Sequence, residues 1–345
     1  MKALDLEKAM PPKGLAPKEA APALEASRNQ PTALIVPSPE EVDAVKTRLR
    51  NEKLDELARD YLTGEIEQAK EAGELGYYAR VLVQVTMPHS DPKSGTFRRE
   101  NGDPRPGGRR LVLSMVNDEQ VGLPFGRYPR LLLAYVTTEA VRTRSREVSL
   151  GPSLSDFLRT LDLPISGGKR GTVRRLRDQM ERLFSSTVIV TYEQEGYKQG
   201  DRLAVADQWD LWWSPKSPEQ VTLWDSRVQL NPKFFEALVD RPVPVDLRAL
   251  KALRSPLALD LYIWLGWRMF VLNQSGRSRV AIPWPLLQRQ FGADYRRARK
   301  FKEKARIALK QVLTFYPEAK IREDDKGSLV LLPSPTPVAS LPPKS

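Results

Sequence analysis

The sequence predicts an α+β protein built from two tandem winged-helix domains, with disordered N- and C-terminal tails. Three observations lead to this fold class. A glycine turn precedes a basic amphipathic helix. The same order of elements returns in the second half of the chain, and both ends of the chain are rich in proline. The 345 residues, 41% of them hydrophobic, are enough to fill two ordinary cores.

The segment Gly167–Phe184 carries the clearest pattern. Its apolar residues recur at intervals of three and four, which places them along one buried stripe of a helix: Val173, Leu176, Met180 and Leu183. The other face holds six basic residues against two acidic ones: Lys169, Arg170, Arg174, Arg175, Arg177 and Arg182 against Asp178 and Glu181. The glycines upstream favour a turn that leads into this helix.

A short helix is predicted just before the glycine turn, over Pro152–Leu163, with Ser153 as its N-cap. Its apolar side consists of Leu154, Phe157, Leu158 and Leu161. An earlier helix over Tyr128–Arg144, entered through Pro129, supplies the first helix of a three-helix core. A short helix, a turn and a basic helix together make a helix-turn-helix, whose second helix can enter a DNA major groove.

A hairpin is predicted directly after the basic helix. Thr187–Gln194 and Arg202–Trp213 have the composition of strands, and Glu195–Asp201 forms the turn between them. A hairpin in this position converts a helix-turn-helix into a winged helix. Val221–Leu230 adds a further strand and Asn231–Val239 a short helix.

Upstream of these elements, Tyr77–Met87 and Leu111–Val116 alternate apolar and polar residues as strands do. Ser94–Arg110 lies between them and is rich in glycine, proline and arginine, which predicts an exposed loop. This loop either contacts phosphate or is only a solvated surface.

The order of elements repeats beyond a proline-marked boundary at 241–244. An apolar helix over Pro256–Leu272 is followed by a short helix over Pro283–Phe291 and a turn at Gly292. A long basic helix over Ala293–Phe315 and two short strands within Lys320–Leu332 complete the repeat. Two copies of one architecture are therefore predicted.

The second basic helix follows the same design as the first. Its inner stripe is Ala298, Phe301, Ala305, Ala308 and Val312, and its net charge over the exposed face is positive. A basic face is often only solvated, but two such helices in equivalent positions favour DNA contact. The predicted DNA-binding residues are Lys169, Arg170, Thr172, Arg174, Arg175 and Arg177 of the first helix, and Tyr295, Arg296, Arg297, Arg299, Lys300, Lys302 and Lys304 of the second.

The chain divides into four predicted parts. Residues 1–39 form a flexible proline-rich tail, in which Ala33–Val36 is an alternative partner-binding segment. Residues 40–240 hold the N-terminal winged-helix domain, which starts with a helix over residues 40–72, and residues 241–332 hold the C-terminal winged-helix domain. Residues 333–345 form a second disordered tail.

The composition excludes several kinds of chemistry. With no cysteine, the chain has neither disulfides nor cysteine-ligated metal, and its single histidine, His89, is expected in a loop. The net charge of +12 favours a polyanionic partner, nucleic acid before anionic membrane. No signal peptide or membrane span is recognisable, so a cytoplasmic location is expected.

Two further groups of residues have a functional and a structural interpretation. The seven tryptophans could stack on bases, but core positions are favoured, particularly for Trp264 and Trp267 inside an apolar helix. Of Trp212 and Trp213, one is expected to face outward. The pairs Asp207 with Asp210 and Asp324 with Asp325 could hold a metal, yet both lie in turns without further acidic partners. We therefore predict no catalytic residue, no metal and no cofactor.

Particular motifs give the chain a family resemblance. Phe-Gly-Arg-Tyr-Pro-Arg at 125–130, Ser-Leu-Ser-Asp-Phe-Leu at 153–158, Gly-Gly-Lys-Arg-Gly-Thr at 167–172 and Met-Glu-Arg-Leu-Phe at 180–184 resemble the RepA replication initiators of IncW-type plasmids. The likeness extends over roughly residues 75–332. It departs from the N-terminal leucine repeat of other iteron initiators at positions 54, 61 and 68, which are Leu, Tyr and Gln.

The resemblance implies a plasmid replication initiator that binds repeated origin sequences, called iterons, through two winged-helix domains. It further implies opening of the origin, recruitment of the host initiator and replicative helicase, and autorepression with copy control. A homodimer is a candidate state, and the protein would be cytoplasmic and plasmid-associated. Two alternatives remain: a winged-helix transcriptional repressor without replication activity, and a primase or nickase.

Overall fold

The computed structural model describes residues 75–338, except 104, 106–107, 169, 214–215, 222–224, 241, 293–294, 296 and 326. The predictions for residues 1–39, for the helix over residues 40–72 and for residues 339–345 lie outside the described residues. The described chain combines helices with antiparallel sheets, which confirms the α+β class.

A first unit is formed by three helices and a three-stranded antiparallel sheet. In chain order its elements are α5 (Arg127–Thr143), β4 (Glu147–Gly151), α6 (Leu154–Thr160), α7 (Thr172–Phe184), β7 (Ala206–Asp210) and β8 (Ser226–Leu230). The strand order in the sheet is β4-β8-β7. The three predicted helices of this unit are therefore present within a few residues of their expected bounds, and Ser153 caps α6 by accepting a hydrogen bond from the Asp156 amide at 3.1 Å.

A second unit has the same order of elements. It consists of α10 (Pro256–Gln274), β10 (Val280–Pro283), α11 (Trp284–Phe291), α12 (Ala298–Phe315), β11 (Ile321–Glu323) and β12 (Ser328–Leu331), with the strand order β10-β12-β11. In both units the sequence pattern missed the strand between the first and second helices. This strand pairs with the last strand of its unit, so it is held by a partner far along the chain.

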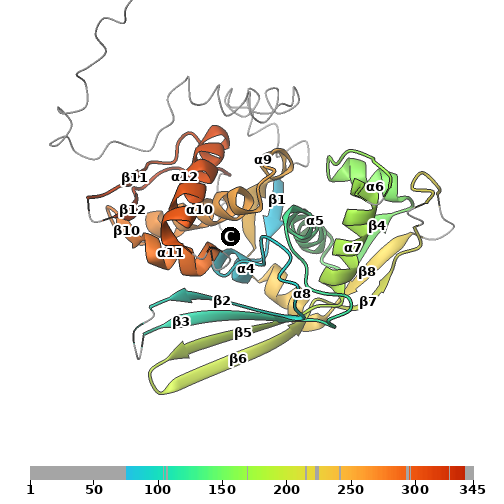
Figure 1. Ribbon diagram of the computed structural model, residues 1–345, viewed down its shortest axis with the longest axis horizontal. Coiled ribbons are helices and arrows are strands. Elements are labelled where there is room, and N and C mark those ends of the chain that lie inside the picture. The colour runs from blue at the N-terminus through green and yellow to red at the C-terminus, as the bar shows by residue number, and fades with distance from the viewer. Residues whose placement is uncertain are drawn as a thin grey trace, which may run out of the picture.

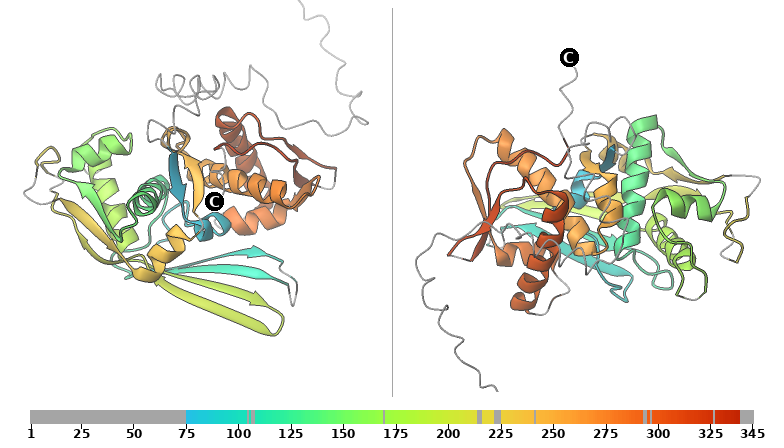
Figure 2. Two further views of the ribbon diagram at one scale, coloured as in Figure 1. Left: turned by 180° about the vertical axis from the view of Figure 1, so that it is seen from behind. Right: turned by 90° about the horizontal axis from the view of Figure 1, so that it is seen from above.

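A separate four-stranded antiparallel sheet accompanies the two units. Its strands are β2 (Thr96–Gly102), β3 (Arg110–Val116), β5 (Thr187–Gln194) and β6 (Tyr197–Ala204), in the order β2-β3-β5-β6. Its two hairpins run side by side below the helices in Figure 1 and again when seen from behind in Figure 2.

The hairpin predicted as the wing of the first unit needs correction: Thr187–Gln194 is strand β5, but it pairs with β6 at 197–204, and the predicted second strand Arg202–Trp213 contains the end of β6 and the separate strand β7. The hairpin pairs through β5 with β3 and belongs to the four-stranded sheet. The chain returns to the first unit at buried Val205, whose amide donates to the Ser186 carbonyl at 3.1 Å. The hairpin of the first unit is instead β7 with β8, which comes later in the chain, because α7 ends at 184 and β7 begins at 206.

Two upstream predictions also need correction. The strand expected over Tyr77–Met87 is a short strand β1 (Leu75–Tyr78) followed by the helix α4 (Arg80–Gln84). The neighbours Leu82 and Val83 are both buried, which a helix allows and an alternating strand does not. The loop expected over Ser94–Arg110 contains strand β2, and only residues 103–109 join β2 to β3.

Three elements connect the units: α8 (Pro232–Val239), β9 (Val243–Asp246) and α9 (Leu247–Ala252). Strand β9 pairs antiparallel with β1, so residues on both sides of the predicted boundary at 240/241 share a sheet. Helices α5 and α10 lie at the centre, with α7 beside α5 and α12 beside α10 (Figure 1). The division into domains at this boundary stays a prediction.

The buried residues form one continuous apolar cluster through both units. Trp264 lies within it and is fully buried, as predicted, whereas Trp267 is half-buried. The start of the predicted C-terminal tail is packed rather than disordered, because Ser334 accepts from the Lys320 amide at 2.9 Å and Asn273 donates to the Ser334 carbonyl at 2.9 Å. Val338 is also buried.

Candidate nucleic-acid interface

The turn before α7 depends on glycine. Gly168 has φ = +82°, a left-handed conformation that side chains disfavour. A Cβ at Gly171 would lie 2.2 Å from the carbonyl oxygens of both Ser166 and Gly167, so no larger residue fits there. The Ser166 hydroxyl accepts from the Thr172 amide at 3.0 Å and so satisfies one of the amides at the start of α7 that have no partner within the helix. This tight turn leads into the first turn of α7, where Thr172 and Val173 are buried and Arg174 and Arg175 are exposed.

Helix α7 has the two faces that its sequence predicts. Val173, Leu176, Met180 and Leu183 are buried against the core of the first unit. Arg170, Arg174 and Arg175 are exposed, and within the described part of the chain their side chains have no hydrogen bond or ion pair. These three guanidinium groups are therefore available to an anionic ligand. Lys169, also predicted here, lies outside the described residues.

Three other polar residues of α7 make contacts within the protein. Arg177 is half-buried and donates to the Trp213 carbonyl at 3.0 Å. Arg182 donates to the Leu123 carbonyl at 3.2 Å and lies over the Phe125 ring. Thr172 is buried, and its hydroxyl lies 3.0 Å from that of Ser166. The structure thus gives Thr172 and Arg177 structural contacts that the sequence pattern did not reveal.

Helix α12 begins at Ala298, five residues later than the sequence suggested. Phe301 packs so tightly against Gly292 that a Cβ there would lie 2.3 Å from its ring. Tyr295 is half-buried and packs against the same ring, with a centroid distance of 5.8 Å. Ala298 is exposed rather than part of the inner stripe, while Phe301, Ala305, Ala308 and Val312 are buried as predicted. The predicted Arg296 lies outside the described residues.

The cations of α12 divide into two groups. Arg297, Arg299 and Lys304 are exposed, and their side chains make no hydrogen bond or ion pair with any residue that the structure describes. Lys300 pairs with Glu303 at 3.2 Å, an exposed contact that water and salt weaken. The first group, together with Lys300, is the set of cations at this helix that is most available to an anionic ligand.

Glu323 on β11 holds the second group. Its carboxylate accepts from Arg306 at 2.5 and 2.7 Å and pairs with Lys302 at 2.9 Å. Burial raises the pKa of Glu323, but the hydrogen bonds from Arg306 and Lys302 outweigh it and leave the pKa below its ordinary value. Lys302 also lies over the Trp284 ring. Lys302, a predicted DNA contact, therefore helps to fasten the hairpin to the helix.

The arginine-rich segment Ser94–Arg110 is largely neutralised by acidic neighbours. Arg98 pairs with Glu100 at 2.8 Å, Arg105 with Asp103 at 2.5 Å, and Arg110 with Glu193 at 3.1 Å. These pairs favour the interpretation of this segment as an ordinary sheet surface over that of a phosphate-binding loop.

The acidic pairs considered as metal ligands have other partners. Asp207 pairs with Arg146 at 3.2 Å, Asp210 with Arg227 at 3.2 Å, and Asp324 accepts from the Ser328 amide at 2.8 Å. Among the described residues, no three His, Asp or Glu side chains come together as a metal site.

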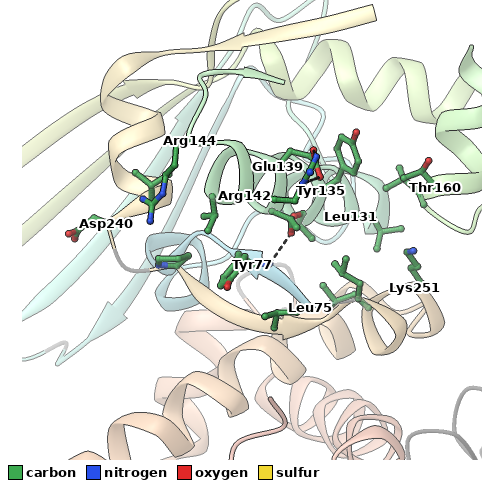
Figure 3. Close-up of a pocket in the computed structure, with 18 residues that line it drawn as sticks. Leu75, Tyr77, Leu131, Tyr135, Glu139, Arg142, Arg144, Thr160, Asp240 and Lys251 are labelled. Atoms are coloured by element: carbon green, nitrogen blue, oxygen red, sulfur yellow. Dashed lines mark hydrogen bonds and ion pairs between the residues drawn. The ribbon is translucent and has the colours of Figure 1, made fainter. Parts of the chain in front are cut away.

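A pocket of about 960 Å³ lies beside α5, between β1, α6 and α9. Figure 3 shows Leu131, Tyr77 and Lys251 at its walls, and the Tyr77 amide donates to the Thr138 hydroxyl at 2.9 Å. Most of the lining is apolar, and the exposed cations of α7 and α12 are not part of it. The pocket is thus separate from the candidate interface.

Sequence reasoning missed two residues that shape the interface. Ser166 does not follow the usual capping pattern, because it stands six residues before Thr172 and not directly before the helix. Glu323 could not have been found either, because it meets Arg306 across 17 residues of chain and through the fold of the hairpin.

Two similarly built units that each present exposed cations at the start of a helix define a candidate nucleic-acid-binding protein. Residues 123–285 match the family model RepA_C, described as plasmid encoded RepA protein. This stretch therefore carries the domain of the plasmid RepA proteins, and the resemblance to RepA seen in its motifs is confirmed.

Two crystal structures of the RctB protein are similar to this chain. One contains selenomethionine derivatives of its domains 2 and 3, with 12% identity, 74% of this chain and 98% of that chain covered, and a TM-score of 0.46. The other contains RctB domains 2-3, with 15% identity, 73% and 96% covered, and a TM-score of 0.44. No curated protein matched the sequence. None of the helices in the described part of the chain has both the length and the apolar character needed to span a membrane.

Proposed function

We propose that the chain is a plasmid replication initiator that binds repeated origin sequences through two winged-helix units. The observation that carries this proposal is the twofold occurrence of helix, strand, helix, basic helix and hairpin, with exposed cations at the start of both basic helices. The RepA_C match over residues 123–285 supports the same class of protein.

Within each unit, some cations would contact base edges and others would contact phosphates. The first turns of a recognition helix usually meet base edges, which assigns Arg174 and Arg175 on α7 and Arg299 and Lys300 on α12 to the groove. Arg170, Arg297 and Lys304 would bind phosphate and add affinity without sequence preference. Binding would deform the duplex rather than cleave it, with no catalytic residue, metal or cofactor involved.

The further steps are those that the family implies. Binding at repeated sites would open the neighbouring DNA and bring in the host initiator and the replicative helicase. Occupation of its own promoter, in a dimeric state, would give autorepression and copy control.

The test is a footprint on the DNA around its own gene. Regularly spaced protected repeats are expected, and protection of one isolated operator would favour a repressor instead. An origin-dependent replication assay in cells separates the two, since a pure repressor cannot maintain the plasmid. Primers or nicks formed by the protein with nucleotides and divalent metal would point to an enzyme.

A further inference from the structure

The two units meet at a buried charge cluster. Arg130 on α5 is 1% exposed and donates from Nε and Nη2 to the two carboxylate oxygens of Asp260 on α10, both at 2.7 Å. His89 Nε2 donates to the same carboxylate at 2.7 Å. We call Arg130, Asp260 and His89 the interunit cluster.

The chain segment that carries His89 is fastened to both units. Arg130 donates to the carbonyls of Met87 at 2.8 Å and Pro88 at 3.1 Å. Thr86, in the same segment, donates to the Gln290 carbonyl of α11 at 3.3 Å. One short segment and one carboxylate thus tie the first helix of the first unit to two helices of the second.

We infer that the interunit cluster sets the position of α7 relative to α12. Helix α7 packs on α5 and α12 packs on α10, so whatever fixes α5 against α10 also fixes the two basic helices. Apolar contact is not directional and tolerates sliding, whereas a two-pronged arginine–carboxylate pair has one good geometry. Buried polar groups can specify a single arrangement in this way.

The fixed position of the two basic helices would matter for DNA, a step that rests on the proposed function. If both basic helices read one duplex, their fixed separation determines which spacing between the two contacted segments is accepted. The interunit cluster would therefore determine which spacing of DNA segments the protein accepts, although it does not contact the DNA itself.

The first experiment measures the separation without DNA. Because the chain has no cysteine, spin labels can be attached at Glu181→Cys on α7 and Ile307→Cys on α12, both exposed positions. The parent should give one narrow distance distribution. The double variant Arg130→Met with Asp260→Leu removes both charges and leaves an apolar contact that can still pack. Its distribution should be broader or shifted.

A matched control removes another buried ion pair, Arg248–Asp246 at 3.0 Å, which lies within α9 and its N-cap. Arg248→Met with Asp246→Asn should leave the distance unchanged. His89→Gln keeps a donor for Asp260 and should broaden the distribution less than the double variant. A parental distribution in the folded double variant would overturn the inference.

The second experiment uses a duplex selected by the parent protein from a random library. Five base pairs inserted at its centre should weaken parental binding at least tenfold. The double variant should lose less than threefold on the same insertion. Equal losses in the two proteins would refute the role in spacing. If the parent selected no duplex, the proposed function would fail, while the distance measurement would still decide on the cluster.

Discussion

The first and second units share an order of elements but differ in how the chain continues after the basic helix. In the second unit, α12 leads within six residues to a hairpin, and only four residues, 324–327, separate its strands β11 and β12. In the first unit, the β5–β6 hairpin comes between α7 and β7 and belongs to the four-stranded sheet. The 15 residues 211–225 then separate β7 from β8. The basic helix is thus the constant part, and the hairpin that follows it is the variable part.

The hairpins also differ in charge. The first unit's hairpin and its flanks carry Asp207, Asp210 and Asp225, which do not contact the exposed Arg174 and Arg175. The second unit's hairpin carries Glu323, which binds two cations of its own helix. The comparison indicates that the hairpin decides how many cations of each helix remain available to DNA.

The largest expected effect is a loss of unfolding free energy, and it tests whether the two units unfold together. Leu176→Ala in α7 and Leu309→Ala in α12 each remove a fully buried side chain, which typically costs about 2–5 kcal/mol. Because one apolar cluster runs through both units, each change should shift the same single transition in chemical denaturation.

Tryptophan fluorescence and far-UV circular dichroism would follow this transition. Ile307→Ala, at an exposed position on α12, is the control and should change the free energy of unfolding by about 0.5 kcal/mol or less. Two transitions, only one of which moves in each variant, would mean that the units are independent bodies.

The next effect compares the units in DNA binding. Arg174→Ala with Arg175→Ala, and Arg299→Ala with Lys304→Ala, each remove two exposed cations without described partners. Loss of one base contact costs about 1–3 kcal/mol, and loss of one phosphate contact lowers the slope of log affinity against log salt by about 0.9. Both variants should therefore bind the selected duplex at least tenfold more weakly in a titration at fixed salt.

The control for this comparison is Arg105→Ala. Arg105 is also exposed, but it pairs with Asp103 in the connection between β2 and β3, so its loss should change binding little. If it weakened binding as much per charge as the helix variants, net charge alone would explain the affinity.

A smaller effect comes from pH acting where the units meet. Burial is the largest influence on the pKa of His89 and lowers it. The carboxylate of Asp260 on α10 raises this pKa, whereas the charges of Arg130 on α5 and Arg99 on β2 lower it. The pKa of His89 therefore lies below 6.5. As the pH falls through 6.5, the unfolded chain gains a proton that the folded chain does not. The free energy of unfolding should therefore fall, by at most about 1.4 kcal/mol per pH unit.

Denaturation between pH 7 and pH 5.5 would measure this slope. His89 is the only histidine of the chain, so His89→Gln should make the stability nearly flat over this range. A parent and a variant with equal slopes would show that His89 titrates alike in both states.

Much of the fold and site was readable from local pattern. The stripe of α7, its glycine turn and the Ser153 cap depend on residues close in sequence, and the structure has each of them. The choice of strand partners was not readable, because nothing in the sequence of β5 or β7 indicates that β5 pairs with β3 and β7 with β8. The pair Arg130–Asp260 spans 130 residues, and no periodicity reveals it.

The smallest effect tests the role of the second hairpin in holding cations. Glu323→Gln keeps the shape of the side chain but removes the charge that binds Lys302 and Arg306. Arg306 is 50% exposed, so solvent screens this contact and the loss of stability should be only about 0.5–1 kcal/mol. The freed cations should raise DNA affinity and steepen its salt dependence, by about 0.9 in slope for each new phosphate contact.

The control is Glu236→Gln on α8, which changes the net charge equally at an exposed site on a different element. It should neither raise DNA affinity nor steepen the salt dependence. Equal gains in the two variants would show that the hairpin does not withhold cations from DNA.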